Sequence, residues 1–391
     1  MPGPLPRLVL SRGKRLAAGH LWIFSNELAA HPKDLAPGSL VEFVDRHGEF
    51  LATGYYNPHS LIAGRVLSRR REPVDAGFFS ARLAAARALR EALYPGADAW
   101  RWVFGEADGL PGLILDRYAD TLVIQSATAG MDRLLPVLLE ALEDHWPAGD
   151  LVLRNDSGVR RLEGLAEEKR VIRGGERPRP VIAEGGRRFQ VDCLEGQKTG
   201  FFLDQRDNRL AFAALAGPGE ALDLCSYSGA WGVHLAARGM EVTCVDVSRR
   251  ALDDGARNAA LNDLAPRMTF TRMDVFEFLQ AARREGRRYR AIVLDPPAFA
   301  KSKAGLRAAL KAYRKANGLA MGLLAPGGWL ASCSCSYHVA PEGFLDLLRH
   351  AGAEQGGGMH LAEYRGQARD HPALLAMPET RYLKCAFLRR R

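Results

Sequence analysis

Two cysteines near the C-terminal end of the chain have a residue type and a spacing that could do nucleophilic chemistry. They stand one residue apart, as Cys333 and Cys335, in the stretch LASCSCSYHV. Such i, i+2 cysteines of a strand point to the same face but are poorly placed to bond each other, and a metal site would have only His338 nearby as a further ligand. Cys333, deeper in the expected strand, fits core packing. Cys335, nearer the strand end, is the candidate nucleophile, which would act as a thiolate.

An aspartate follows a second apolar run, in the stretch AIVLDPPAFAKSK. Four apolar residues precede Asp295, and Pro296 and Pro297 then fix the backbone and prevent a helix from continuing. A carboxylate held at such a strand end can hydrogen-bond the polar edge of a flat heterocycle, and burial would raise its pKa so that it shares a proton there. The alternative is an exposed aspartate in a proline-rich turn.

A turn that contains glycine joins an apolar run to a helix in the stretch ALDLCSYSGAWGVHLAARGMEVTCVDVS. Gly229 lets the backbone approach a ligand, Ser226 lies in the same turn, and Asp246 at the end of the next strand can accept both hydroxyls of a ribose. Tyr227 stands where a dinucleotide fingerprint has its first glycine, which argues for an adenosine ligand without phosphates, such as S-adenosyl-L-methionine. The alternative is an ordinary strand, turn and helix. Asp274, which closes the following strand, fits an adenine contact or a helix N-cap.

The stretch GQKTGFFLDQRDNR, residues 196–209, precedes the first of these strands. Lys198 and Arg206 bring positive charge, two phenylalanines bring an apolar wall, and a polar run that starts a helix begins at Asp204. We interpret the segment as a flap that closes over the carboxylate of the cofactor. A solvated helix start is the alternative.

The elements that must position these residues alternate strand and helix from about residue 181 onward. The expected strands are EALDLCS, EVTCVDV, MTFTRMD, RAIVLDP and GWLASCS, with helices between them. This rhythm predicts a parallel, doubly wound sheet over residues 181–391, in which ligands bind beyond the C-terminal ends of the strands.

Two further domains are expected before this sheet. Residues 1–73 alternate apolar and polar positions between turns (LVEFVD, FLATGYY, LIAGRVLS), which is typical of a small antiparallel β-barrel. Residues 76–180 predict a small α+β domain with a helix FFSARLAAARALREAL, a strand pair GLILDRYADTLVIQSA, an amphipathic helix MDRLLPVLLEALEDHW and a strand DLVLRND. The stretch RGGERPRP, residues 173–180, is expected to be a linker or an exposed hairpin.

Composition and charge exclude several classes of protein. The 391 residues contain six cysteines without a disulfide framework or a zinc-type quartet, so we expect reduced thiols, no metal and a cytoplasmic location. We expect neither a secretory signal nor a membrane-spanning segment. The net charge of +9 and the pI near 9.4, with clusters such as Arg69 to Arg71, leave nucleic-acid binding open.

The motifs KTGFFLDQR, CSYSG, DPPAF and SCS together resemble the bacterial large-subunit ribosomal RNA cytosine-5 methyltransferases of the RlmI-like family. The likeness covers nearly the whole chain, because RLVLSRGKRLAAGHLWIFSNEL and the strands after it resemble the PUA RNA-binding domain, and GEADGLPGLILDRY is similar to the central α+β domain. The resemblance implies an α/β fold, with a Rossmann-like methyltransferase domain preceded by a PUA-like barrel and a small α+β domain.

The resemblance also implies a reaction and a set of site residues. Cys335 would attack carbon 6 of a cytosine in 23S rRNA, so that carbon 5 can take the methyl group of S-adenosylmethionine. Related enzymes carry a second cysteine after the Asp-Pro motif to assist release; here that position is Ala298, so the releasing base is not identified. The residues expected around the cofactor are Asp204, Arg206, Ser226, Gly229, Asp246, Asp274 and Asp295. Those expected to contact RNA are Lys198, Pro296, Pro297, Phe299 and Lys301.

Two other functions compete with this one. An RNA guanine N-methyltransferase is similar in the flap motif and in Asp-Pro-Pro, and would not need Cys335. A non-catalytic RNA-binding assembly factor would keep the fold but bind no S-adenosylmethionine. Exposed strand edges in the middle domain also leave room for a homodimer.

Overall fold

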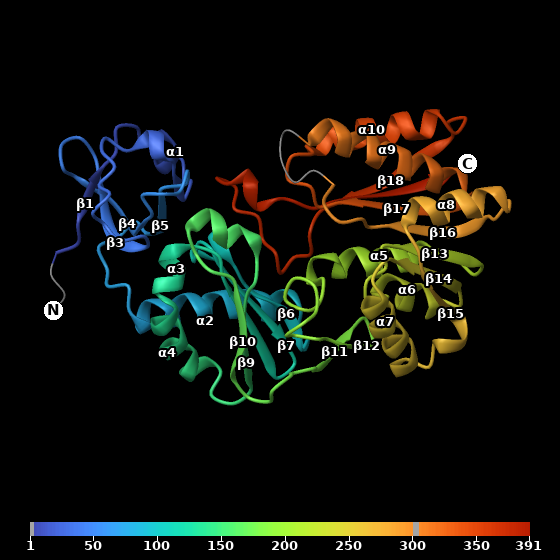
Figure 1. Ribbon diagram of the computed structural model, residues 1–391, viewed down its shortest axis with the longest axis horizontal. Helices are drawn as coiled ribbons and strands as arrows, with labels where there is room; N and C mark the ends of the chain where they lie inside the picture. Colours follow the sequence, from blue (N-terminus) through green and yellow to red (C-terminus); the bar gives the residue numbers. More distant parts are fainter. Residues whose placement is uncertain (1–3, 300–304) are drawn as a thin grey trace. The chain divides into compact units, whose positions relative to one another are not determined.

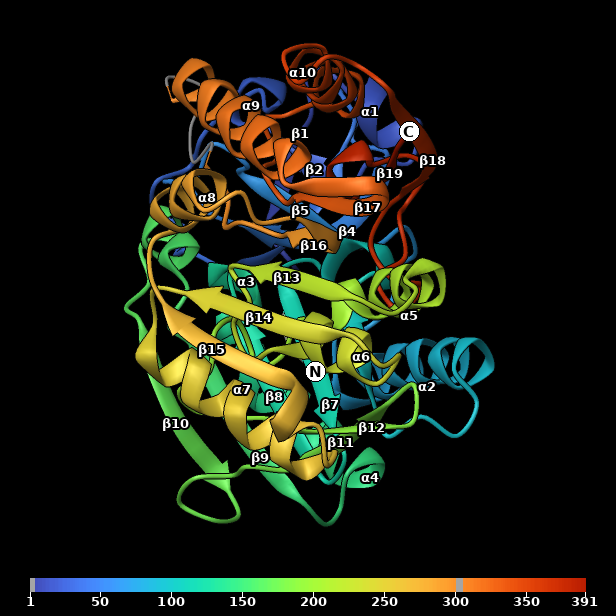
Figure 2. The same ribbon diagram turned by 90° about the vertical axis from the view of Figure 1, so that its right-hand side faces the viewer.

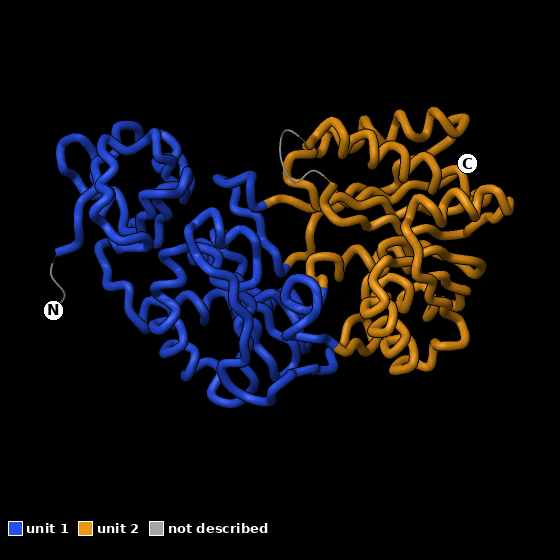
Figure 3. Tube along the Cα trace, viewed as in Figure 1, with its two compact units in different colours: residues 1–182, 191–201, 370–380 blue, residues 183–190, 202–369, 381–391 orange. Residues whose placement is uncertain are grey.

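The computed structural model describes residues 4–299 and 305–391 (Figure 1). These residues form two compact units (Figure 3): unit 1 contains 4–182, 191–201 and 370–380, and unit 2 contains 183–190, 202–299, 305–369 and 381–391. The division into three domains at residues 1–73, 76–180 and 181–391 stays a prediction.

The first sheet of unit 1 is formed by the strands predicted for the N-terminal barrel. Its order is β1 (Arg7–Val9), β3 (Ser39–Val44), β4 (Phe50–Tyr56), β5 (Gly64–Ser68) and β2 (Trp22–Ile23), and all neighbours except β1 and β3 are antiparallel. A short helix, α1 (Lys14–Ala17), precedes β2. Because alternate side chains of β3 point inward, Val41 and Phe43 are completely buried in the core of this sheet.

The second sheet of unit 1 has the order β10 (Glu168–Arg173), β9 (Asp150–Asn155), β8 (Thr121–Ser126), β7 (Leu113–Tyr118) and β6 (Ala99–Phe104). Helices α2 (Ala76–Leu93) and α4 (Leu135–His145) pack against each other, and their apolar side chains enter its core. The single helix predicted for MDRLLPVLLEALEDHW is wrong. Its first residues belong to α3 (Ala129–Arg133), and α4 begins anew with Pro136 in its first turn, because proline has no N–H to continue a helix.

Unit 2 is built on a seven-stranded sheet, and its first five strands are those that the sequence predicted. The order is β15 (Met268–Arg272), β14 (Glu241–Asp246), β13 (Glu220–Leu224), β16 (Tyr289–Leu294), β17 (Leu324–Ser334), β19 (Lys384–Arg390) and β18 (Met359–Arg365). The first five are parallel, as predicted, whereas β19 and β18 add two antiparallel pairings that were not predicted.

Helices cover both faces of this sheet (Figures 1 and 2). On one face lie α5 (Arg206–Leu215), α6 (Ala230–Ala236) and α7 (Arg249–Leu261), and the second strand of the hairpin β11 (Val181–Glu184) and β12 (Arg187–Gln190) packs against α6 and α7. On the other face lie α8 (Val275–Arg284), α9 (Leu306–Gly322) and α10 (Pro341–Ala353), whose apolar side chains share a core with β13, β16 and β17. Within the described residues, none of the helices combines the length and the apolar character that crossing a membrane requires.

Candidate active site

The C-terminal ends of four parallel strands bring several of the predicted site residues to one edge of the sheet. Leu224 of β13 pairs with Val245 of β14 and with Leu294 of β16, and Leu294 pairs with Ser332 of β17. Asp246 ends β14, Asp295 follows β16, and Cys335 follows β17. Ligands of doubly wound sheets bind at this edge.

The electrostatics of Cys225, which follows β13, show how closely the acidic residues gather. Burial raises the pKa of the Cys225 thiol well above its usual range, and the carboxylates of Asp246, Asp295, Asp223 and Asp274 raise it further. Three of these acids were predicted site residues. Asp223 was not singled out, although its position inside an apolar strand was a visible signal.

The turn after β13 has the backbone of a glycine-rich loop, although only one of its three residues with positive φ is glycine. Cys225, Tyr227 and Gly229 all have positive φ, at 59°, 47° and 71°. Asp246 holds this conformation, because one of its carboxylate oxygens accepts the N–H of Tyr227 at 3.0 Å and the other accepts the N–H of Ser248 at 2.9 Å. Non-glycine residues in this region cost free energy and are concentrated at functional sites.

The two serines of this turn provide a test of whether the site fits a polar ligand. The hydroxyl oxygens of Ser226 and Ser228 are buried and have no hydrogen-bond partner among the residues that the structure describes. Buried polar groups in folded proteins are normally paired, so these hydroxyls lack the partner that a bound ligand would supply. The hydroxyl, carboxylate and ammonium groups of S-adenosylmethionine are suitable partners, and the residues present therefore fit this cofactor.

Asp295 is held by two side chains that sequence reasoning missed. One oxygen of its half-buried carboxylate accepts the side-chain N–H of Gln205 at 2.9 Å and the indole N–H of Trp231 at 3.2 Å. Gln205 comes from the 3₁₀ turn Leu203–Gln205 and Trp231 from α6. Gln205 lies in the motif KTGFFLDQR, and Trp231 follows the motif CSYSG by two residues. Their position next to these motifs was the signal that could have identified them. The carboxylate is therefore fixed in direction at the sheet edge.

The two cysteines of the SCSCS stretch have different surroundings. Cys333 is completely buried, and its sulfur lies 3.2 Å from that of Cys385, which faces it on the antiparallel strand β19. Burial raises the pKa of the Cys333 thiol, and Cys385 and Asp295 raise it further. Cys335 is partly exposed, beyond the end of β17. The arrangement leaves Cys335 as the thiol that a substrate could reach.

Hydrogen bonds from α9 hold the residues on both sides of Cys335. The hydroxyl groups of Tyr313 and Ser336 are 3.0 Å apart, and the Ser332 hydroxyl donates to the side-chain oxygen of Asn317 at 2.6 Å. The Asn317 amide in turn donates to the carbonyl of Tyr313 at 2.9 Å. Tyr313 and Asn317 were not predicted, because neither stands in a recognisable motif.

Asp274 caps a helix. Its exposed carboxylate accepts the N–H groups of Phe276 at 2.8 Å and Glu277 at 3.3 Å at the start of α8. The sequence had left this N-cap alternative open. Because the carboxylate of Asp274 also lies near enough to raise the pKa of Cys225, an adenine contact is compatible with the N-cap.

The motif KTGFFLDQR is divided between the two units. Lys198 is exposed in unit 1 and has a φ of 52°. In unit 2, Asp204 and Arg206 are buried, so the alternative of a solvated helix start is wrong for them. Asp204 accepts the hydroxyl of Tyr382, and Arg206 lies 3.6 Å from Glu184.

Glu184 explains why a buried arginine is tolerated there. It is completely enclosed and forms two hydrogen bonds with Arg209, at 2.6 and 2.7 Å, and one contact of 3.1 Å with His234. Burial alone would raise the pKa of Glu184, but Arg209 and His234 together lower it below its usual range. Buried charges persist when they are paired in this way. The assignments of Asp204 and Arg206 to the cofactor stay predictions.

The residues expected to contact RNA after Asp295 differ in exposure. Pro296 is buried and Pro297 is exposed. The ring of the half-buried Phe299 packs on that of Tyr313, with 4.6 Å between the ring centres. Lys301 lies outside the described residues. The expected RNA contacts of all these residues, and of Lys198, stay predictions.

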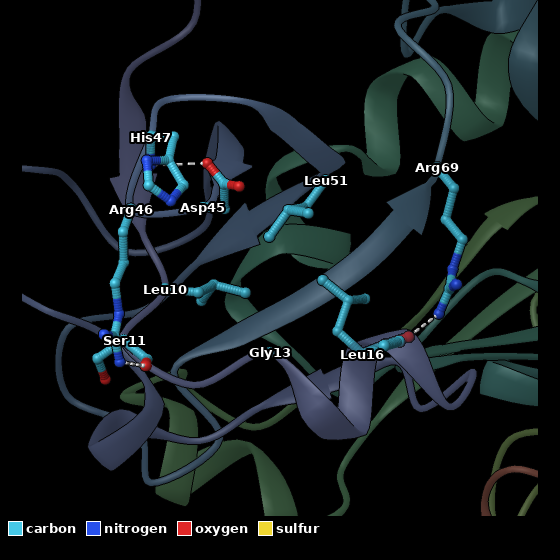
Figure 4. A pocket seen from close by; sticks show the side chains of 10 residues that line it. Leu10, Ser11, Gly13, Leu16, Asp45, Arg46, His47, Leu51 and Arg69 are labelled. Carbon is cyan, nitrogen blue, oxygen red and sulfur yellow. Dashed lines mark hydrogen bonds between the residues drawn. The ribbon is translucent and has the colours of Figure 1, made fainter.

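The N-terminal sheet carries a pocket that no motif indicated (Figure 4). The pocket has a volume of about 410 Å³, with apolar side chains from Leu10, Leu16 and Leu51 and exposed basic side chains from Arg46, His47 and Arg69. Arg46 donates to the carbonyl of Ser11 at 2.7 Å, and Arg69 donates to the carbonyl of Leu16. Each guanidinium has further N–H groups to offer. An apolar floor with a basic rim suits a nucleotide.

Comparison with known proteins finds family models that match the N-terminal sheet with its pocket and the part of the chain that contains the sheet edge of unit 2. Residues 8–69 match the family model of the PUA-like domain, and residues 172–379 match that of S-adenosylmethionine-dependent methyltransferases. The ribosomal RNA large subunit methyltransferase I of Aeromonas hydrophila is 40% identical over 391 residues, which cover 98% of each chain. That of Salmonella arizonae is 38% identical over 97% of this chain and 96% of its own.

Solved structures show the same fold. A SAM-dependent methyltransferase from Streptococcus mutans is similar with a TM-score of 0.82 and 20% identity, over 98% of this chain and all of its own. A methyltransferase crystallised with SAH has a TM-score of 0.84 and 21% identity, over 99% of this chain and all of its own. The PUA-like domain, the doubly wound methyltransferase fold and the use of S-adenosylmethionine are thereby confirmed. Since these two relatives match it at 40% and 38% identity over almost their full length, the chain belongs to the ribosomal RNA large subunit methyltransferase I family.

Proposed function

We propose that this protein transfers the methyl group of S-adenosylmethionine to carbon 5 of a cytosine in 23S ribosomal RNA, through a covalent adduct with Cys335. The observation that carries the proposal is the partly exposed thiol of Cys335 at the strand edge that also bears Asp295 and the Ser226–Gly229 turn. The names of the relatives support an rRNA substrate, and that substrate implies a cytoplasmic location.

The chemistry follows from the two groups at the edge of the sheet. The Cys335 thiolate bonds to carbon 6 of the ring, and the electron pair of the double bond between carbons 5 and 6 moves onto the ring, so that carbon 5 becomes nucleophilic. Bound S-adenosylmethionine supplies the methyl group that it carries on a positively charged sulfur. Carbon 5 takes up this methyl group. A base then removes the proton from carbon 5, the double bond forms again, and the thiolate leaves.

Asp295 orients the ring in this scheme. Gln205 and Trp231 donate to the same oxygen of its carboxylate, and the carboxylate held in this way would contact the polar edge of the cytosine. A proton shared there would stabilise the negative charge that the thiolate delivers to the ring. Ser226, Ser228 and Asp246 would hold the cofactor beside it.

The pocket of the N-terminal sheet is proposed as a contact for the RNA outside the target cytosine. Arg46 and Arg69 would contact phosphates, and the leucines would pack against a base or a ribose. Contacts of this kind position the RNA without selecting its sequence.

Two variants test the reaction. Unmethylated 23S rRNA from cells that lack the gene is incubated with the enzyme and labelled S-adenosylmethionine, and the product nucleotide is identified by mass spectrometry. Cys335→Ala should lose transfer entirely, whereas Cys333→Ala, which removes a buried thiol, should retain it. Transfer by Cys335→Ala, with the methyl group on a guanine nitrogen, would instead establish the competing guanine N-methyltransferase.

Calorimetric titration with S-adenosylmethionine decides the other competing function. A catalyst must bind the cofactor, and Asp246→Ala should weaken that binding because it frees the turn at Tyr227. A protein that binds RNA but no S-adenosylmethionine would be a non-catalytic assembly factor.

The proposed homodimer would use the free edge of β10, the outer strand of its sheet, whose first three residues are exposed. Backbone groups of such an edge can pair with a second copy. Light scattering after size-exclusion chromatography would give twice the monomer mass for a dimer, and the monomer mass would contradict it.

A further inference from the structure

Lys384 is a buried cation next to the proposed nucleophile. It begins β19 and lies directly opposite Ser334, the last residue of β17, so that Cys335 is the next residue along the facing chain. The residue is only 4% exposed. A lysine in such a place requires a physical reason, because burying a charge is costly unless it is paired.

Carbonyl groups account for two of the three ammonium protons. The Lys384 nitrogen donates to the carbonyl of Ser336 at 2.7 Å and to that of Tyr382 at 2.8 Å. No carboxylate among residues 4–299 and 305–391 forms an ion pair with it. The two carbonyls fix the direction of the ammonium but do not neutralise it, and one N–H remains.

The group that can neutralise the charge is Cys335. Burial lowers the pKa of Lys384 to about 8, while the negative charge of the Cys335 thiolate opposes this and raises it. Electrostatic effects between two groups are mutual, so the ammonium must favour the thiolate as much as the thiolate favours the ammonium.

We propose that the Lys384 ammonium holds Cys335 as a thiolate and thereby prepares it to attack the pyrimidine. The inference rests on the proposed role of Cys335 and adds the residue that activates it. The Ser336 carbonyl belongs to the segment that the hydroxyl of Tyr313 fixes. The hydrogen bond that holds the residue after Cys335 therefore also fixes the direction of the Lys384 ammonium.

The experiment measures the reactivity of the thiol apart from methyl transfer. The full chain and the variants Lys384→Met and Lys384→Arg are treated with iodoacetamide at pH 7, and alkylation of each cysteine is followed by peptide mass spectrometry. Free N-acetylcysteine in the same reaction serves as the reference, because Cys193, Cys244, Cys333 and Cys385 are buried and burial raises the pKa of Cys225. Melting temperature and S-adenosylmethionine affinity identify the variants that keep the fold.

Lys384→Met should slow alkylation of Cys335 at least about tenfold, because a neighbouring charge shifts a pKa by one unit or more. Methyl transfer should fall by a similar factor, while alkylation of the free N-acetylcysteine and cofactor affinity stay unchanged. Lys384→Arg should restore most of both rates. If the arginine does not fit, the rate of Cys335 alkylation in Lys384→Met, relative to that of the free N-acetylcysteine, still decides.

Unchanged alkylation of Cys335 in a folded Lys384→Met variant would overturn the inference while leaving the proposed function intact. Cys335→Ala tests the proposed mechanism independently of the role of Lys384. If that variant still methylates cytosine, the proposed mechanism fails, but slower alkylation in Lys384→Met would still establish the pairing of Lys384 with Cys335.

Discussion

Replacing Asp223 with asparagine should stabilise the protein, and the gain should grow as the pH rises from 5 to 7. Asp223 lies in the middle of β13 and is completely buried, and one of its oxygens accepts the N–H of Gly232 at 2.9 Å. Burial raises its pKa from 3.8 to about 8, and the carboxylates of Asp295 and Asp246 contribute to the increase. The side chain is therefore protonated in the native protein at neutral pH, and asparagine has nearly the same shape as this neutral form.

The sign and the size follow from proton binding. Between pH 3.8 and about 8 the native state holds a proton on Asp223 that the unfolded state has released, so the free energy of unfolding decreases as the pH rises. Each pH unit is worth about 1.4 kcal/mol, so the two units from pH 5 to 7 amount to about 2–3 kcal/mol. Asparagine does not titrate, so the variant does not lose this part of the unfolding free energy as the pH rises.

The assay is urea unfolding of the wild type and the variant at several pH values, without cofactor. The quantity of interest is the difference in unfolding free energy between the two proteins, because other titrating groups cancel in it. Asp253→Asn in α7, whose side chain is 47% exposed and pairs with Arg249 at 3.0 Å, provides the control for losing a carboxylate near the surface. A difference for Asp223→Asn that stays constant from pH 5 to 7 would refute the reasoning about this buried acid.

Three further predictions concern packing, capping and RNA. Gly255→Ala in α7 should destabilise the protein by about 1–3 kcal/mol in urea unfolding, because the new methyl group would lie 2.7 Å from the ring of Phe270. Gly217→Ala is the control, since its methyl group would meet no atom within 4 Å. Equal effects of the two substitutions would contradict the clash. Ser248→Ala should cost about 1 kcal/mol in thermal unfolding, since the hydroxyl accepts an N–H at 3.2 Å at the start of α7, and an unchanged melting temperature would argue against this cap. Arg69→Ala should weaken RNA binding and reduce by about 1 the slope of log affinity against log salt; an unaltered slope would mean that Arg69 contacts no phosphate.

Local patterns were sufficient for the scaffold of the site. Buried parallel strands appear in a sequence as short apolar runs, and the runs that end at Asp246 and Asp295 therefore predicted both the strands and the edge at which these acids meet. The glycine turn was recognisable as well, although Tyr227 takes its left-handed backbone without being glycine. Residue type and position along a strand were enough here, because the geometry is set within a few neighbouring residues.

What the sequence by itself determined is thus the parallel sheet, its functional edge and the acids and thiols placed there. The position along the strand also predicted that Cys333 is enclosed and Cys335 is not, whereas only the tertiary structure decided which side chains surround each of them. Cys385, 52 residues further along the chain, seals Cys333, while Gln205 and Trp231 reach Asp295 from 90 and 64 residues away. Lys384 comes beside Cys335 because β19 inserts antiparallel next to β17, and its order in the sheet follows from how the whole core packs rather than from any local pattern.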